Sequence, residues 1–316
     1  MFQYLLTILM IPLLIHFGNW DQEEDLFVKL FNKIPEQPKE ISFTNLFEIN
    51  NNGGHLQGIQ LIKKGEDIFV VATGSSDVYS YYVVTKLGEK NEVISVNQLM
   101  QKPYKHAGGF QIFEDYMAIG IEDNSAKDKS KVCIFSISDP QNPSVIPIAQ
   151  IERNGQPLRS TAGCVGITRH RDKYIVAVGD WDTKHIDFYI CENEKIEKGN
   201  FKKVYTMETA KLSKQGWIDK SWTTYQNINL FSTNTHLYMI GTGQNSKQQN
   251  CADLYQLNWD LPESVQMKKV ASKTFSTTQK NNFKAGAGFY FDNHTLKGIS
   301  CGYNVEETSF FNIYTN

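Results

Sequence analysis

Five related segments recur along this chain, and no other feature limits its fold as strongly. Each begins with small or polar residues, continues as a strand, turns over a few polar residues and returns as a second strand that ends near glycine. This order is typical of a β-hairpin. Successive segments start 51, 55, 63 and 60 residues apart, about the length of a four-stranded propeller blade with its loops. They start at His55, His106, Thr161, Thr224 and Lys284.

Further strands follow the hairpins. A third strand, rich in aromatic and β-branched residues, comes next, for example "YSYYVVTKL" at residues 79–87. A fourth often follows a turn with proline and aspartate, as after "DPQNP" at residues 139–143. Proline suits such a turn because its ring fixes φ near −65°, and the aspartate side chain accepts a backbone hydrogen bond. Four strands per unit indicate a blade.

The two ends of the chain decide the topology. The last unit, residues 284–316, has only three strands, whereas residues 41–50 form a strand that belongs to no unit. If this strand pairs with residues 308–315, the ring closes and no sheet edge stays open there. We therefore predict an all-β fold, a five-bladed β-propeller over residues 41–316, in which the N-terminal strand completes the C-terminal blade.

The N-terminal segment predicts export. Residues 2–17 are apolar and contain no Lys, Arg, Asp or Glu, as in the hydrophobic region of a secretory signal, although the usual basic start is missing. A retained membrane anchor and a buried helix are the alternatives, but the run is shorter than the roughly 20 residues of a membrane span and contains Pro12. We expect residues 1–20 to be a signal peptide or anchor, no membrane span in the mature form, and a secreted, cell-surface or periplasmic protein.

Residues 21–40 form a lead-in to the propeller. Within it, Leu26 with Leu30 and Phe27 with Phe31 have the i, i+4 spacing of a short amphipathic helix. Prolines at positions 35 and 38 end it. The long stretch at residues 205–226 has no clean alternation, so we expect an outer strand with an excursion across one face, or a small lid.

Charge and cysteine content exclude some functions. The 32 basic and 34 acidic residues are scattered and give a net charge of −2, so the basic stripe that nucleic acid requires is missing. The five cysteines form no zinc-binding pattern. We interpret them as buried apolar residues, or as one disulfide with the rest unpaired if the chain is exported. We expect a monomer.

Polar residues at the five openings predict a ligand site. The first strand of a propeller blade lines the central channel, so equivalent residues form rings around the axis. These side chains bind either ordered water, an organic or anionic ligand, or a metal. One predicted ring consists of His55, His106, Thr161, Thr224 and Lys284, and a second of Gln60, Gln111 and Asn229.

A second candidate group lies where the second strands end. Its carboxylates are either solvated loop acids, calcium ligands or the acid and base of a hydrolase. Calcium, with Asp180 and Asp182 as ligands, is the one cofactor that we consider. Trp181 beside them either stacks on a sugar or fills the space between blades. The candidate catalytic residues are Glu122, Asp123, Asp180 and Asp182.

One turn resembles a known repeat. Residues Ile137, Ser138, Asp139, Pro140, Asn142 and Pro143 match the signature "I-D-[IL]-S-D-P-x-N-P" of LVIVD-type repeats. The match is confined to the second unit. The resemblance implies a secreted or surface β-propeller, and because members of that family are mostly uncharacterised, it carries over no catalytic residue.

Three functions follow as hypotheses. The first is an exported module that binds an extracellular small molecule, glycan or protein, since no nucleophile elbow, P-loop or HExxH motif occurs. The second is a hydrolase that acts on a glycan or a phosphorylated substrate at one mouth of the channel. The third is a structural surface protein held by an uncleaved anchor.

Overall fold

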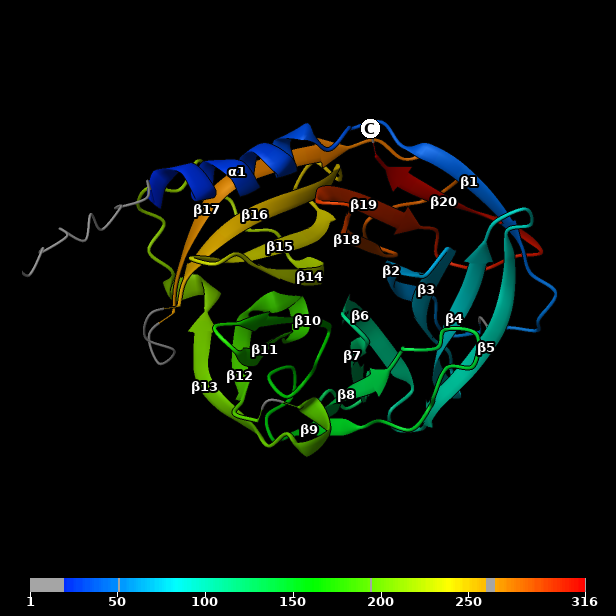
Figure 1. Ribbon diagram of the computed structural model, residues 1–316. Helices are drawn as coiled ribbons and strands as arrows, with labels where there is room; N and C mark the ends of the chain where they lie inside the picture. Colours follow the sequence, from blue (N-terminus) through cyan, green and yellow to red (C-terminus); the bar gives the residue numbers. More distant parts are fainter. Residues whose placement is uncertain (1–19, 51, 194, 260–264, 316) are drawn as a thin grey trace, which may run out of the picture.

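Five four-stranded antiparallel sheets stand around one axis in the part of the chain that the computed structural model describes (Figure 1). That part comprises residues 20–50, 52–193, 195–259 and 265–315; of residues 20–25 and 198 only the backbone is described. The predicted five-bladed β-propeller is thereby confirmed. The predicted signal peptide or anchor lies outside the described residues.

The strands of each blade run in chain order from the axis outward, except that the fifth blade takes its outer strand from the N-terminus. Blade 1 contains β2 (Leu56–Lys64), β3 (Asp67–Ser75), β4 (Tyr79–Leu87) and β5 (Glu92–Gln101). Blade 2 contains β6 (His106–Phe113), β7 (Tyr116–Glu122), β8 (Lys129–Ser136) and β9 (Ala149–Asn154). Blade 3 contains β10 (Cys164–His170), β11 (Lys173–Gly179), β12 (His185–Cys191) and β13 (Phe201–Glu208). Blade 4 contains β14 (Tyr225–Ser232), β15 (Leu237–Gln244), β16 (Asn250–Asn258) and β17 (Gln266–Phe275). Blade 5 contains β18 (Ala287–Asp292), β19 (Thr295–Cys301), β20 (Thr308–Tyr314) and β1 (Lys39–Thr44).

Strand β1 closes the ring as predicted. It runs antiparallel to β20, with Ile41 opposite Phe311, and the rings of Phe43 and Phe311 stack 4.1 Å apart. The strand ends at Thr44 and does not reach residue 50. The reason is local: the Asn45 side chain hydrogen-bonds both the N–H and the carbonyl of Phe47, which turns the backbone away from β20.

Helix α1 (Trp20–Lys33) confirms the predicted amphipathic helix and packs on the outside of blade 4 (Figure 1). Phe27 stacks on Tyr238 at 4.3 Å, and Phe31 is fully buried. At the end of the helix the Lys273 ammonium donates to the Asn32 carbonyl at 2.8 Å, which suits the negative end of the helix dipole. No helix in the described residues is long and apolar enough to cross a membrane.

Apolar clusters between neighbouring blades form the core. All five cysteines are buried in it as free thiols, which confirms their interpretation as apolar residues. Burial raises the pKa of the Cys133 thiol to about 12. Burial of each large aromatic or aliphatic side chain contributes about 1.5–3 kcal/mol.

Residues 205–226 form the end of the outer strand β13 and an excursion, the first of the two predicted alternatives. Two short 3₁₀ turns lie before β13, at Trp181–Thr183 and Ile196–Lys198. After β13 a further 3₁₀ turn lies at Thr209–Lys211, and the chain then crosses to blade 4. There the Trp217 indole donates to the Met267 carbonyl at 3.0 Å. The fully buried Lys269 ammonium reaches Asp219 and Asp253, each at 3.1 Å. The excursion is therefore fixed to β17.

Candidate functional site

Amide side chains fill the axis between the inner strands. Gln111 of blade 2 accepts from the backbone N–H of Ile167 at 2.9 Å and of Leu230 at 2.7 Å, and donates to the Leu230 carbonyl at 2.8 Å. Because Leu230 belongs to blade 4, these bonds cross the axis. Asn229 accepts from Phe289 N–H of blade 5 at 2.8 Å.

The glycines of the inner strands allow this close approach. A Cβ at Gly109 would lie 2.3 Å from the Gln226 carbonyl oxygen and 2.4 Å from Asn227 Oδ1. Asn227 itself accepts from Phe110 N–H at 3.1 Å and donates to the Gln57 carbonyl at 3.2 Å. Strands from blades 1, 2 and 4 thus meet at the axis, and side chains separate its two ends.

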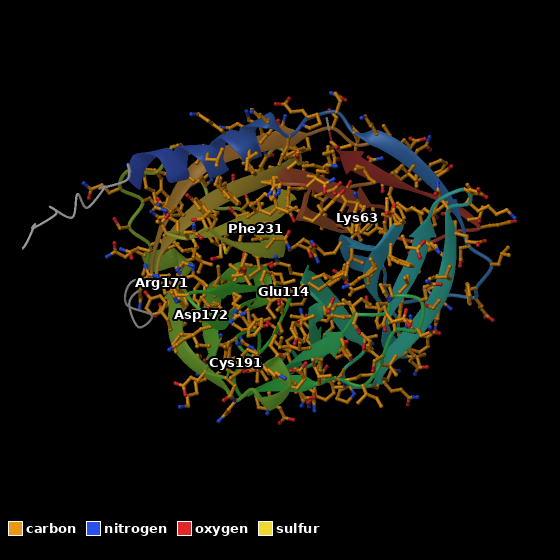
Figure 2. All side chains as sticks on the ribbon, in the orientation of Figure 1. Lys63, Glu114, Arg171, Asp172, Cys191 and Phe231 are labelled. Atoms are coloured by element: carbon orange, nitrogen blue, oxygen red, sulfur yellow. The ribbon has the colours of Figure 1, made fainter. Side chains whose placement is uncertain are left out.

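The two ends carry separate cavities, the first mouth where the inner strands begin and the second mouth where they end. The second mouth is the larger, with a volume of about 760 Å³. Figure 2 shows Lys63, Glu114 and Phe231, which line it, around the axis. The predicted ring of Gln60, Gln111 and Asn229 lies buried between the mouths, and only Gln111 also lines a cavity, at the floor of the second mouth.

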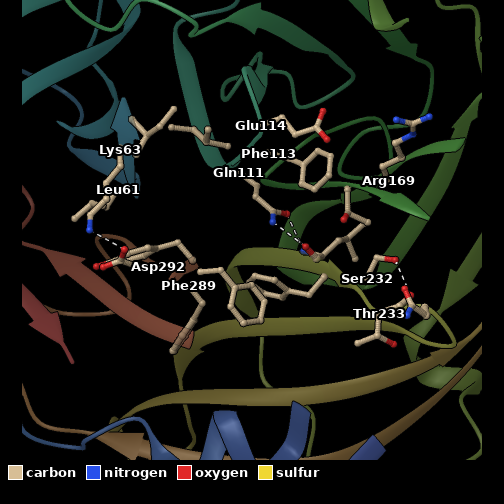
Figure 3. A pocket seen from close by; sticks show the side chains of 18 of the residues that line it. Leu61, Lys63, Gln111, Phe113, Glu114, Arg169, Ser232, Thr233, Phe289 and Asp292 are labelled. Carbon is tan, nitrogen blue, oxygen red and sulfur yellow. Dashed lines mark hydrogen bonds and ion pairs between the residues drawn. The ribbon is translucent and has the colours of Figure 1, made fainter. Parts of the chain in front are cut away.

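Charged groups at the second mouth pair with one another (Figure 3). Asp292 accepts from Lys63 at 2.7 Å and from Lys297 at 2.6 Å, and these two lysines hold its pKa below the usual value, Lys297 more strongly. Arg169 lies 3.6 Å from Asp172. Between these pairs the wall is aromatic, with Phe113 and Phe289.

The first mouth brings both predicted groups of candidate residues together. Its cavity has a volume of about 540 Å³. Starts of inner strands supply one part of the wall, and loops after second strands supply the other. The predicted residues that line it are His55, His106, Glu122, Asp180, Trp181, Asp182, Thr224 and Lys284.

Glu122 and His106 form an incompletely bonded pair on this wall. Glu122 is fully buried and accepts from Ala162 N–H at 2.7 Å through Oε2. Its Oε1 lies 3.2 Å from His106 Nδ1. The two atoms are not aligned for a hydrogen bond, and neither has another hydrogen-bond partner among the described residues. Such buried groups are rare because an unmade hydrogen bond costs about 1–3 kcal/mol.

Asp180 is bonded more completely. It accepts from His185 N–H at 2.8 Å and contacts His185 Nδ1 at 2.6 Å. Burial raises its pKa, and the hydrogen bonds from His185 oppose that shift. In the described residues no group of three or more His, Cys, Asp or Glu side chains is arranged to hold a metal ion. The calcium site expected at Asp180 and Asp182 stays a prediction, because carbonyl and amide oxygens also bind calcium.

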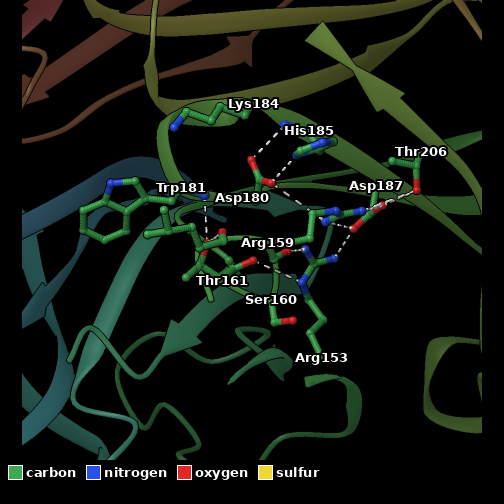
Figure 4. Close-up of polar contacts among 12 residues, drawn as sticks. Arg153, Arg159, Ser160, Thr161, Asp180, Trp181, Lys184, His185, Asp187 and Thr206 are labelled. Carbon is green, nitrogen blue, oxygen red and sulfur yellow. Dashed lines mark hydrogen bonds and ion pairs between the residues drawn. The ribbon is translucent and has the colours of Figure 1, made fainter. Parts of the chain in front are cut away.

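A buried ion cluster holds the loop beside Asp180 (Figure 4). Asp187 accepts from Arg153 at 2.5 Å and from both terminal nitrogens of Arg159. Burial would raise the pKa of Asp187, but bonds from Arg159, Arg153 and Thr206 outweigh it and hold the value at about 2. Arg159 also lies 4.0 Å from Asp180. The cluster thus connects blades 2 and 3 at a separate cavity, and Arg159 brings it near the first mouth.

Trp181 stands at the edge of this cavity, half-buried. The backbone N–H of Trp181 donates to Thr161 Oγ1 at 2.7 Å. The Lys127 ammonium lies 3.5 Å from the centre of the indole ring. Asp182 and Thr183, which follow, have φ values of +61° and +49°. A backbone held in this region is strained and fixes the turn that carries the indole.

Two predicted residues have other roles. Thr161 is fully buried and supports Trp181 instead of lining the cavity. Asp123 turns away and accepts from Ser125 N–H at 2.9 Å and Ala126 N–H at 3.0 Å. Both bonds stabilise the loop after β7.

Sequence reasoning missed several amides of the first mouth. Gln57 and Gln226 each lie at a register shift of an inner strand, between Leu56 and Gly58 in β2 and between Tyr225 and Asn227 in β14. Strict alternation along a strand does not reveal the direction of a side chain at a β-bulge. Gln226 donates to Gln57 Oε1 at 2.6 Å across the cavity. The other missed polar side chains are Ser75, Asn124 and Gln248.

Comparisons with known proteins address the fold. No family model matches the chain and no curated protein matches it in sequence, so the resemblance to LVIVD-type repeats still rests on one turn. The GH43_1 enzyme from Xanthomonas citri in complex with xylose has 8% identity over 90% of this chain and 91% of its own, with a TM-score of 0.50. A thermostable family-43 glycoside hydrolase has 11% identity over 86% and 91%, with a TM-score of 0.49. At such low identity the likeness concerns the fold alone, and the chain is a five-bladed β-propeller.

Proposed function

We propose that this protein binds a saccharide at the first mouth. The Glu122–His106 pair is the observation that carries the proposal. Both atoms are covered in this structure, and the His106 ring, the more exposed of the two side chains, has to turn to admit a ligand. A sugar hydroxyl both donates and accepts, so one hydroxyl can then donate to Glu122 Oε1 and accept from His106 Nδ1. Bonds to an ionised group in a site of low dielectric are the stronger ones.

The rest of the wall suits the same ligand. Trp181 offers an apolar ring that can stack on the face of a sugar. Neutral amides of Gln57, Gln226 and Gln244 provide further donors and acceptors. A volume of about 540 Å³ lies in the range of pockets for small organic ligands.

The test begins with a saccharide array, followed by calorimetric titration of the sugars that bind. We expect Glu122→Gln to weaken binding by about tenfold or more, because a charged hydrogen bond is replaced by a neutral one. Asp123→Asn is the matched control. The carboxylate of Asp123 is buried next to Glu122 in the sequence but faces away from the cavity, so binding should change less than about twofold. Equal binding by wild type and Glu122→Gln would refute the site.

Glycoside hydrolysis is the second candidate. It is favoured by the presence of two buried carboxyl groups, Glu122 and Asp180, on one cavity wall, because such hydrolysis uses a pair of carboxyl groups. The raised pKa of Asp180 suits a proton donor. Release of nitrophenol from aryl glycosides, lost in Asp180→Asn while binding persists, would support catalysis. If the wild-type protein binds the aryl glycoside without releasing nitrophenol, it is a binding protein and not a hydrolase.

Export of the protein belongs to the same proposal. It rests on the apolar, uncharged run at residues 2–17. N-terminal sequencing of protein from the culture medium should find a chain that starts near residue 21. An intact N-terminus in the membrane fraction would favour the anchored surface protein instead.

A further inference from the structure

One edge of the first mouth carries a positive charge without an acidic partner. Lys284, directly before β18, is exposed and lines the cavity. No ion pair connects its ammonium group to any Asp or Glu among the described residues, whereas Lys63 and Lys297 at the second mouth share Asp292. An ammonium group held at a concave surface attracts anions more strongly than one on a convex surface.

His55, on the adjoining blade, lines the same cavity but adds no charge to it. Burial lowers its pKa and outweighs the hydrogen bond with the Leu56 carbonyl, which raises it. The charges of His106 and Lys284 lower the pKa further, so the ring is neutral at pH 7. We call Lys284 the cationic edge.

The acids of the first mouth do not neutralise the cationic edge. Glu122 is directed at Ala162 N–H and His106, and Asp180 at His185. Asp182 is exposed, but it follows β11 on blade 3, which does not adjoin blade 5 in the ring. A ligand that spans the cavity therefore meets positive charge at Lys284, beside blade 5.

We infer that the saccharide bound at the first mouth is acidic, with its carboxylate at the cationic edge and its hydroxyl groups toward Glu122 and His106. This inference rests on the proposed function and narrows it to uronic-acid-type sugars. A carboxylate accepts from the Lys284 ammonium in a charge-assisted hydrogen bond. The corresponding ester lacks the charge and retains the shape.

The experiment titrates the full chain with a uronic acid disaccharide and with its methyl ester in low salt. We expect the acid to bind about tenfold to a hundredfold more tightly than the ester, the range of a charged hydrogen bond. Lys284→Gln should reduce this ratio to about one, and added salt should reduce it in the wild type. Lys280→Gln, which removes an equal charge from the same segment outside the cavity, should leave the ratio unchanged.

The outcomes separate the two proposals. Equal binding of acid and ester by the wild type would overturn the acidic preference and leave saccharide binding intact. Binding of neither sugar, together with an empty array, would overturn both. A preference that persists in Lys284→Gln, or that disappears equally in Lys280→Gln, would overturn the assignment to the cationic edge.

Discussion

The two mouths of the propeller differ in size and in how many of their buried polar groups have a hydrogen-bond or ion-pair partner. The second mouth is larger, at about 760 Å³ against about 540 Å³, yet Lys63, Asp292 and Lys297 pair with one another there. The first mouth is smaller and, among the described residues, leaves three buried atoms without a hydrogen bond, Glu122 Oε1, His106 Nδ1 and Asn124 Oδ1, against one, Arg169 Nε, at the second mouth. Buried polar atoms without hydrogen-bond partners are a better guide to a ligand site than the volume of the cavity.

The ion pairs near the two mouths also differ in burial, and this difference predicts the largest effect on the free energy of unfolding. Asp187→Asn should lower the free energy of unfolding by about 3 to 5 kcal/mol, because it leaves the buried Arg153 without its counter-ion. At the second mouth, Asp292→Asn removes a partly exposed pair and should cost about 1 kcal/mol or less. Urea unfolding of both variants measures the difference. Equal losses would contradict the comparison.

The separation of the mouths depends on Gln111. Gln111→Ala should lower the free energy of unfolding by about 2 to 4 kcal/mol, since it leaves two buried backbone N–H groups, of Ile167 and Leu230, without their acceptor. Denaturant titration checks this. A loss below about 1 kcal/mol would indicate that water replaces the amide and that the axis is open.

Low pH should lower the free energy of unfolding through Asp187, which lies near the first mouth. Its folded-state pKa of about 2 is below the unfolded value of about 3.9, so its contribution is fully present above the unfolded value and is lost as pH falls through the folded one. The difference corresponds to about 2.5 kcal/mol. Unfolding of wild type and Asp187→Asn between pH 5 and pH 2 should show their stabilities converging by about that amount. A constant gap would mean that Asp187 has an ordinary pKa.

The smallest effect should appear in ligand binding. Trp181→Ala should weaken saccharide binding by about tenfold through loss of the stacking face. Phe113→Ala, an aromatic truncation at the second mouth, should change it by less than about twofold. Calorimetry with one sugar measures both. The reverse order would place the ligand at the second mouth.

The fold could be predicted from sequence because its signals are local and repeated. Hairpins that recur every 51 to 63 residues predict the inner strands, and the unpaired strand before His55 predicts the closure by β1. The predicted end of β1, residue 50, lies beyond the observed end, Thr44. The reason is that the turn at Asn45 depends on one side chain that hydrogen-bonds the backbone.

The candidate site could be predicted only in part. The positions of His106 and Glu122 at one mouth followed from blade geometry. The roles of Gln111 and Asn229 did not, because their partners lie on other blades and no local pattern identifies them. The same holds for the Arg153–Asp187 pair, whose residues are 34 positions apart.

A crystal structure of the protein with a bound saccharide tests the central claim most directly. Electron density for the ligand is expected at the first mouth, with one ligand hydroxyl at hydrogen-bond distance from both Glu122 Oε1 and His106 Nδ1. Density at the second mouth alone, or a sugar at the first mouth that leaves this pair untouched, would contradict the claim.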